Sequence, residues 1–333
     1  MEILIDLSSV RSPVVFPQYS DSYKAVNNLG NTLVIGIPGA GKTEICTQRG
    51  EKNFDLGLKT LALMFSRSSR DVYKARVPSA EVYTIHSYCY QDVGWKQNYQ
   101  DLLYRFILKE PKEEYDEVIV DELQDISPLQ LDAINSIPKK TLFAVGDPFQ
   151  SIYIGEWARS HYDSPAMGQK IFDKLSKNST VISLHENWRS NQYMVDVLDS
   201  FIPRDMVPKG PKELEVTGIF TRNHREEKEV ANFLNALGLS YKIWVNSDRD
   251  NPSFKSIGID PKIDLMVMHC CKGREYKRSF IFDWDGSTEE DLNLLYTSLA
   301  RSAEMAYIVG YKCMGNLVPK VQRIPLDDFG LLL

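Results

Sequence analysis

Val118-Ile119-Val120-Asp121-Glu122-Leu123-Gln124-Asp125 is the stretch that decides the fold of this 333-residue chain. The apolar, β-branched residues 118–120 predict a buried strand of a parallel sheet, with the carboxylates at its C-terminal end. Two adjacent carboxylates in that place suit phosphoryl transfer, because one can hold Mg²⁺ while the other orients or deprotonates a water molecule. Taken alone, the acidic run is equally typical of a solvated turn.

A second motif, Gly36-Ile37-Pro38-Gly39-Ala40-Gly41-Lys42-Thr43, matches the pattern G-x-x-x-x-G-K-[ST] at every position. Residues 32–35 before it predict a strand, and residues 44–50 predict the start of a helix. Such a loop binds phosphates with backbone N–H groups at a helix N-terminus, where the dipole favours anions. Lys42 would reach the β- and γ-phosphates, and the Thr43 hydroxyl would bind Mg²⁺. Together with the acidic run, the motif predicts an NTP·Mg²⁺ site.

The composition is that of an ordinary globular protein, with 43% hydrophobic and 25% charged residues. A net charge of −6 argues only weakly against nucleic-acid binding, because a local groove can be basic on an acidic protein. The odd number of cysteines, without metal-ligand spacing, is typical of a reducing compartment. Charged residues interrupt the N-terminal apolar residues, and no apolar run reaches about 18 residues. We therefore expect no signal peptide, no membrane span and a cytoplasmic location.

Strand-like runs alternate with helical patterns along the chain, which predicts parallel, doubly wound α/β architecture. The length suits about two domains, and we place them at residues 1–183 and 184–333. Segment 246–262 contains several Pro, Ser and Asp residues and predicts a surface loop. The predicted strands cover residues 33–35, 60–64, 118–120, 141–145, 181–184, 216–220, 241–245, 263–268, 279–282 and 306–309. The predicted helices of the second half cover residues 226–237 and 291–301.

Seven further motifs follow in a fixed order between and after the first two. They are LALMFS (61–66), YTIHS (83–87), VGDPFQSIY (145–153), LHENWRS (184–190), FTRN (220–223), MHCCKGREY (268–276) and LYTSLARS (295–302). With this ordered set, the chain resembles the UvrD/Rep-type superfamily 1 DNA helicases over roughly residues 30–310. An ordered set of this size is far more specific than any one of its members.

The resemblance implies two tandem RecA-like, P-loop NTPase domains with ATP and Mg²⁺ bound between them. The family residues that match Arg189 and Arg301 act as arginine fingers, which neutralise charge on the γ-phosphate. The alternative for each arginine is an ordinary surface salt bridge. Gln150 matches the family's γ-phosphate sensor. Asp121 would hold Mg²⁺, and Glu122 would position the attacking water.

Two residues are expected to contact the nucleoside. Trp188 stands where the family usually has a Tyr stacked on adenine, and an indole offers a larger π-face; the alternative is a core Trp. Glu275 matches an acid near the ribose, and its alternative is an ion pair with Lys272 or Arg274. The adenine-reading glutamine of the family has no clear equivalent, because Gln18 is out of position. The specificity for ATP is therefore inferred mostly from the other motifs.

The predicted DNA groove depends on aromatic and histidine side chains. Phe65, His86, Tyr153 and His269 match positions that contact single-stranded DNA in the family. Aromatic stacking holds successive bases without regard to sequence. After Tyr153 the sequence departs from the family pattern. Trp157, in this run, is expected to supply a further stacking ring from a shifted loop. The alternative is a packed core position for Phe65, His86, Tyr153 and His269.

The insertions that relatives carry are absent or vestigial in this chain. Only residues 88–120 separate the His-Ser motif from the acidic run, and only residues 245–264 precede the motif at His269. The first stub contains Trp95, Tyr99 and Tyr104. These aromatics would either form a small wedge at a duplex junction or pack inward, and we favour inward packing.

The predicted function is an ATP-driven, single-stranded DNA translocase with helicase activity, moving 3′ to 5′ on single strands or tailed duplexes. The alternative is a nucleotide-switched clamp that holds nucleic acid or a partner protein and hydrolyses slowly. The intact arginine pair, Gln150 and Glu122 favour the motor. RNA stays open as the strand, because backbone-tracking grooves discriminate sugars poorly. A partner protein that loads the motor or raises its processivity also stays open.

Overall fold

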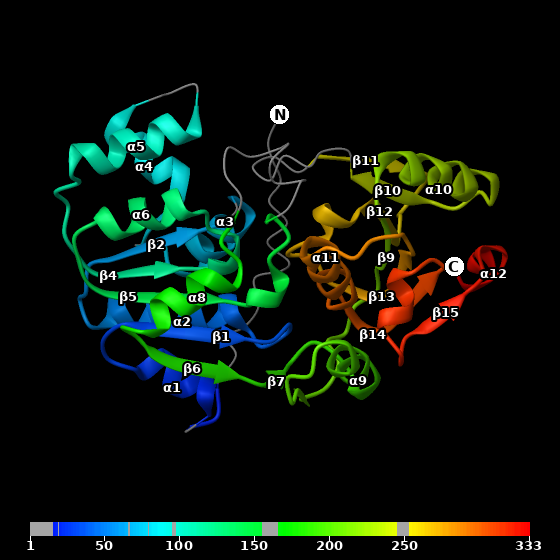
Figure 1. The fold of residues 1–333 in the computed structure, drawn as a ribbon, viewed down its shortest axis with the longest axis horizontal. Coiled ribbons are helices and arrows are strands. Elements are labelled where there is room, and N and C mark those ends of the chain that lie inside the picture. Colours follow the sequence, from blue (N-terminus) through cyan, green and yellow to red (C-terminus); the bar gives the residue numbers. More distant parts are fainter. Residues whose placement is uncertain are drawn as a thin grey trace. The chain divides into compact units, whose positions relative to one another are not determined.

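The computed structural model describes residues 16–18, 20–65, 67–78, 80–94, 98–154, 166–244 and 253–333, which form two compact units. The first unit comprises Gly41–Pro148 with the described residues 16–36 and 166–184. The second comprises His185–Leu333 with Ile37–Ala40 and residues 149–154. The predicted domain ranges, 1–183 and 184–333, stay a prediction. Each unit is an α/β layer structure (Figure 1), and none of the described helices is long and apolar enough to cross a membrane.

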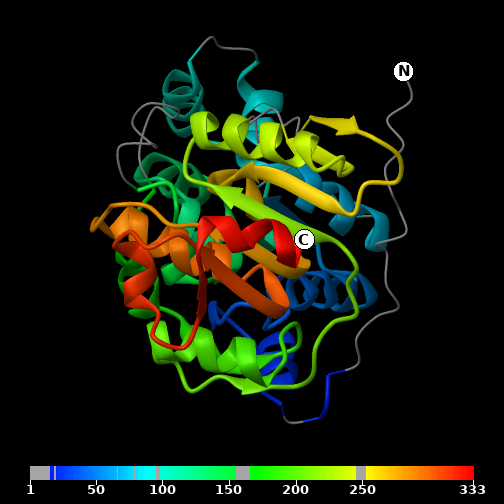
Figure 2. The same ribbon diagram turned by 90° about the vertical axis from the view of Figure 1, so that its right-hand side faces the viewer.

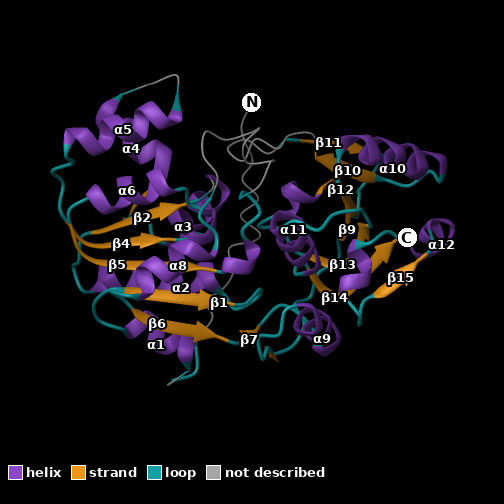
Figure 3. Cartoon of the chain, viewed as in Figure 1, coloured by secondary structure: helices purple, strands orange, loops and turns teal. Residues whose placement is uncertain are grey.

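The first unit is built on a six-stranded, entirely parallel sheet with the order β3-β2-β4-β5-β1-β6. Its strands are β1 Thr32–Gly36, β2 Thr60–Met64, β3 Glu81–Thr84, β4 Tyr115–Val120, β5 Lys139–Gly146 and β6 Thr180–Leu184. Its helices are α1 Asp21–Asn27, α2 Lys42–Asp55, α3 Arg67–Arg76, α4 Ile85–Val93, α5 Tyr99–Lys109, α6 Pro128–Ser136 and α8 Gln169–Ser176. Helices flank the sheet on both sides (Figure 3).

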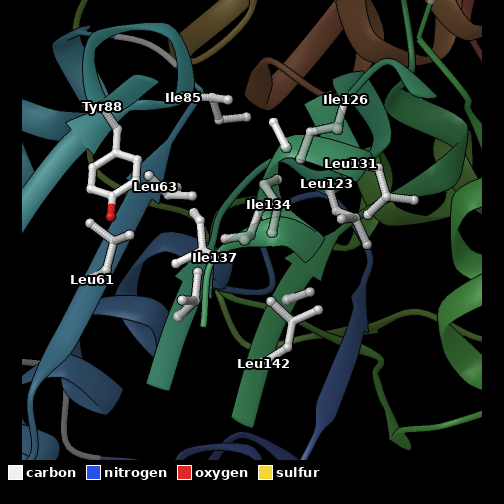
Figure 4. Close-up of a cluster of buried hydrophobic side chains, with 14 of the residues drawn as sticks. Leu61, Leu63, Ile85, Tyr88, Leu123, Ile126, Leu131, Ile134, Ile137 and Leu142 are labelled. Carbon is white, nitrogen blue, oxygen red and sulfur yellow. The ribbon is translucent and has the colours of Figure 1, made fainter. Parts of the chain in front are cut away.

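One face of this sheet forms a core with α4, α5 and α6. Leu61 and Leu63 of β2 point to this face, because alternate residues of a strand share a side. They pack with Tyr88 of α4 and Ile134 of α6 (Figure 4). Both faces of β2 and β4 are buried, which explains why these strands are continuous apolar runs in the sequence.

A buried ion pair ties α2 to β4. Two nitrogens of Arg49 donate to the two carboxylate oxygens of Glu117, each at 2.8 Å. Asn53 Nδ2 at 2.7 Å and Thr141 Oγ1 at 3.1 Å donate to the same carboxylate. Another nitrogen of Arg49 donates to the Val26 carbonyl of α1 at 2.7 Å. The pair is therefore fully hydrogen-bonded and joins α1, α2 and β4.

Replacing Glu117 by Ala should destabilise the first unit by about 3–5 kcal/mol, because the Arg49 guanidinium would stay buried without its carboxylate. The matched control is Glu114→Ala, which removes an exposed carboxylate three residues away. Urea denaturation followed by circular dichroism measures both variants. Equal midpoints for the two variants would contradict a stabilising role for the Arg49–Glu117 pair.

The second unit contains a seven-stranded sheet with the order β11-β10-β12-β9-β13-β14-β15. It is parallel except for the antiparallel pair β10–β11. Its strands are β9 Thr217–Thr221, β10 Tyr241–Trp244, β11 Phe254–Ile257, β12 Ile263–Val267, β13 Tyr276–Phe282, β14 Ser302–Val309 and β15 Gln322–Ile324, and β7 Glu186–Asn187 pairs with β8 Val207–Pro208 outside it. Its helices are α9 Gln192–Phe201, α10 His224–Ala236, α11 Glu289–Leu299 and α12 Leu326–Leu332.

Helices α10 and α12 pack on one face of this second sheet (Figure 2). Phe329 of α12 lies in that core. Its ring centroid is 5.1 Å from that of Phe280 of β13 and 5.7 Å from that of Phe233 of α10. Val230 and Leu234 of α10 complete the contact with the sheet. Helices α9 and α11 contact β14 of the same sheet.

The predicted α/β class with two parallel sheets is confirmed, apart from the antiparallel edge strand β11 of the second sheet. Of the loop predicted at 246–262, residues 246–252 lie outside the described residues. The prediction is wrong at residues 254–257, because they form the edge strand β11. The ring of Phe254 lies 5.0 Å from that of Trp244, a cross-strand contact that local composition does not reveal. The predicted strand and helix cores elsewhere match observed elements within a few residues.

The inward packing predicted for the aromatics of the first stub is wrong for Tyr99 and Tyr104. They are 54% and 56% exposed, whereas Leu102, Leu103 and Phe106 form the buried face of α5. A helix in this position needs one apolar stripe, and these three residues already provide it. Trp95 lies outside the described residues.

Candidate active site

The phosphate-loop motif forms the turn between β1 and α2. Gly39 and Gly41 have φ values of +73° and +77°, a conformation that L side chains rarely adopt. Helix α2 begins at Lys42, so the N–H groups of its first turn lack intrahelical acceptors. Lys42 Nζ donates to the Gly36 carbonyl at 3.1 Å. The turn therefore offers backbone N–H groups and one ammonium group to an anion.

The acidic run meets the start of α2. Thr43 Oγ1 donates to Asp121 Oδ2 at 2.9 Å, and the Glu122 N–H donates to Asp121 Oδ1 at 2.9 Å. Burial, and then the charge of Glu122, raise the pKa of the Asp121 carboxyl above its usual range. A bound cation would relieve both effects, and hydroxyl and carboxylate oxygens are the ligands that Mg²⁺ prefers. The residues present therefore fit Mg²⁺ held by Thr43 and Asp121.

Glu122 is held in a specific orientation by Gln124, a residue of the acidic motif to which the sequence pattern assigns no role. Gln124 is fully buried; its Nε2 donates to Glu122 Oε2, and its Oε1 accepts the N–H of Asp147 at 3.0 Å. Glu122 itself has a φ of +54°, which is uncommon for a residue other than glycine and often marks a functional site. A Cβ on Gly146 would lie 2.5 Å from Gln124 Oε1, so the glycine makes room for this amide.

Gln150 and Arg301, the predicted sensor and one predicted finger, bind each other within the second unit. Arg301 Nη2 donates to Gln150 Oε1 at 2.6 Å, and the two residues are only 4% and 3% exposed. Arg301 Nε also donates to the Thr297 carbonyl at 3.0 Å. Lys272 Nζ donates to the Gln150 carbonyl at 3.1 Å. The Arg301 guanidinium is therefore held by Gln150 and by the Thr297 carbonyl. Gln150 is held by Arg301 at its side chain and by Lys272 at its backbone carbonyl.

Arg189, the other predicted finger, forms an ion pair with Glu275 at 2.9 Å. Lys212 binds the same carboxylate. The alternative partners predicted for Glu275 are wrong. Lys272 donates to the backbone carbonyl of Gln150. The guanidinium carbon of Arg274 lies 3.2 Å from the centroid of the Trp244 ring. The contacts of Glu275 join residues that are distant in sequence, which local spacing does not reveal.

Trp188, expected to stack on adenine, is half-buried in the second unit. Its backbone N–H donates to the Gly39 carbonyl at 2.9 Å, and the Lys209 ammonium lies 5.8 Å from its ring centroid. Within the described part of the chain, its buried indole N–H has no hydrogen-bond partner. A ligand with an acceptor atom would satisfy this group.

The residues predicted for the DNA groove differ in exposure. Phe65 and His86 are half-buried in the first unit. Tyr153 and His269 are buried in the second unit, and His269 Nε2 lies 3.4 Å from Glu290 Oε1. Trp157 lies outside the described residues. The assignment of all five to a DNA groove stays a prediction.

Residues 22–156 match a family model described as an AAA domain. This part, less than half of the chain, is therefore similar to an ATPase domain, and the two relatives that follow are described as helicases. A probable DNA helicase II homolog of Mycoplasma capricolum is 36% identical over 126 residues, which are 37% of this chain and 16% of that protein. One subunit of the ATP-dependent helicase/nuclease of Carboxydothermus hydrogenoformans is 33% identical over 116 residues, 34% of this chain and 9% of that protein. The chain thus matches less than a fifth of the length of either relative.

Solved structures with a similar course of the chain are also helicases by their descriptions. One of them is described as DNA unwinding at forked duplex DNA by two coordinating Pif1 helicases. It has a TM-score of 0.49 and is 13% identical in sequence, and the match covers 88% of this chain and 92% of that chain. A complex of the arterivirus nonstructural protein 10 helicase with DNA has a TM-score of 0.48 and 12% identity, covering 90% and 64%. At these values the likeness carries no argument about function.

Proposed function

We propose that this chain is an ATP-dependent, single-stranded DNA translocase with helicase activity and 3′ to 5′ polarity. The observation that carries the proposal is the contact of Thr43 with Asp121, which brings the phosphate loop to the acidic run. Gln124 holds Glu122 beside this pair, where a general base is required. The partial similarity to DNA helicases supports DNA as the track.

In the proposed reaction, the first turn of α2 and Lys42 bind the phosphates of ATP. Mg²⁺, when bound by Thr43 and Asp121, supplies neutralisation of phosphate charge. Glu122 orients the attacking water and takes its proton. Arg189 and Arg301 add positive charge as negative charge develops on the γ-phosphate.

Stepping would follow from a change in DNA grip between nucleotide states. We propose Phe65, His86, Tyr153, Trp157 and His269 as DNA contacts, and Gln150 as the link from the γ-phosphate to these contacts. Trp188 and Glu275 would bind the adenosine. The proposed polarity comes from the resemblance to the UvrD/Rep type.

A slowly hydrolysing clamp is the second candidate function. The Arg189–Glu275 ion pair favours it, because an arginine already bound to a carboxylate must leave that partner before it can serve a phosphate. Burial makes such a pair costly to break. A clamp would bind nucleic acid or a partner protein in one nucleotide state and step poorly.

ATP hydrolysis should rise strongly when single-stranded DNA is added, because strand binding and nucleotide turnover are coupled in a motor. A phosphate-release assay with and without oligo-dT measures this, with Lys42→Ala as the inactive control. Strand displacement on 3′-tailed, 5′-tailed and blunt duplexes then tests polarity. Hydrolysis that no nucleic acid stimulates would favour the clamp, and substantial turnover by Lys42→Ala would contradict the assigned site.

A further inference from the structure

We propose that Tyr99, on the shortened insertion of the first unit, is a base-stacking residue for the single strand. The proposal rests on the proposed function, because it needs a nucleic-acid strand as ligand. It adds to the predicted groove a residue that the sequence motifs do not include. It also gives the insertion a role other than wedging a duplex.

The rings of Tyr99 and His86 lie against each other. Their centroids are 4.4 Å apart and their planes are inclined by 42°. Tyr99 is more than half exposed, although its ring is held by this contact. An aromatic ring that is fixed on one side and accessible to solvent loses little conformational freedom when a base stacks on it.

The ring contact brings the first turns of α4 and α5 together, because His86 is the second residue of α4 and Tyr99 is the first residue of α5. Tyr99 meets His86 at the start of both helices, and Lys109 Nζ meets Asp92 Oδ1 at 2.8 Å near both ends. Helix N-termini carry partial positive charge, which suits the phosphates of a strand. The carboxylate of Asp101 in the first turn of α5 is paired with Arg105 at 2.9 Å. This ion pair reduces the repulsion between the carboxylate and a phosphate of the strand.

The buried core of α5 does not require an aromatic residue at position 99. The buried stripe of α5 consists of Leu102, Leu103 and Phe106, and Tyr99 lies outside it. Tyr104 on the same helix is equally exposed, and no ring contact is found for it among the described residues. The two tyrosines share residue type, helix and exposure, and Tyr99 in addition contacts the His86 ring.

This pair of tyrosines provides a matched experiment. Fluorescence anisotropy measures the affinity of labelled oligo-dT and of an abasic strand of equal length for the intact chain. Tyr99→Ala should weaken oligo-dT binding by about 5- to 100-fold, the range for one lost base stack, while Tyr104→Ala changes it little. Tyr99→Phe should restore binding, because it keeps the ring. On the abasic strand, Tyr99→Ala and the wild type should bind equally.

Three outcomes would overturn the proposal: equal binding by Tyr99→Ala and Tyr104→Ala, equal loss on oligo-dT and the abasic strand, or no rescue by Tyr99→Phe. Tyr99→Leu is the second variant if the alanine variant does not fold, because it keeps an apolar side chain and removes the π-face. If the wild type binds no strand and its ATPase is not stimulated, the proposed function itself fails. If the wild type binds but the two alanine variants agree, only the role of Tyr99 fails.

Discussion

Replacing Glu122 by Gln should lower the kcat for ATP hydrolysis by about 10²- to 10⁴-fold and leave ATP affinity nearly unchanged. Glutamine has the same length as glutamate, and its carbonyl oxygen can still accept the hydrogen bond from Gln124 Nε2. It cannot take a proton from the attacking water. Single-turnover hydrolysis and equilibrium binding of a fluorescent ATP analogue separate the two effects.

The control for Glu122→Gln is Glu114→Gln, which removes an exposed negative charge from the same unit. It should change neither turnover nor ATP affinity. If Glu122→Gln loses binding and turnover to the same extent, the residue is structural and the base is elsewhere. The left-handed backbone of Glu122 makes this a real alternative, because a strained residue can serve the shape of the turn alone.

The central strands of the parallel sheets could be predicted from the sequence because they are buried on both faces. Such strands are continuous apolar runs, and Thr60–Met64 was predicted with its observed bounds. The meeting of Thr43 with Asp121 also follows from the sequence pattern. The C-terminal ends of parallel strands lie at one edge of a sheet, and each motif directly follows such a strand.

The remaining features depend on contacts between residues that are far apart in sequence. The carboxylate of Glu275 binds Arg189 and Lys212, although Lys272 and Arg274 stand much closer to it in the sequence. Strand β11 is defined by its pairing with β10, and it lies in segment 246–262, whose overall composition is typical of a loop. The exposure of Tyr99 is set by which three residues of α5 face the core. Local propensity carries little information on any of these.

Replacing Arg301 by Ala should lower kcat by about 10³- to 10⁵-fold if its guanidinium neutralises charge in the transition state. A structural role is the competing explanation, because the change would also leave buried Gln150 Oε1 without its 2.6 Å donor. Losing that donor should cost about 1–3 kcal/mol of stability. Thermal unfolding measures this cost independently of catalysis.

Two further variants separate catalysis by Arg301 from structural support. Arg301→Lys keeps the charge but not the planar fork of donors, so a finger should lose most of its effect on kcat even where the fold is retained. Arg278→Ala is the control, because it removes a half-buried arginine of the second unit, one that binds Thr217 and belongs to the interior of β13. Its kcat should equal that of the wild type. If Arg301→Ala falls within about tenfold of this control in kcat while its unfolding temperature drops, Arg301 supports the position of Gln150 and supplies no charge to the phosphate.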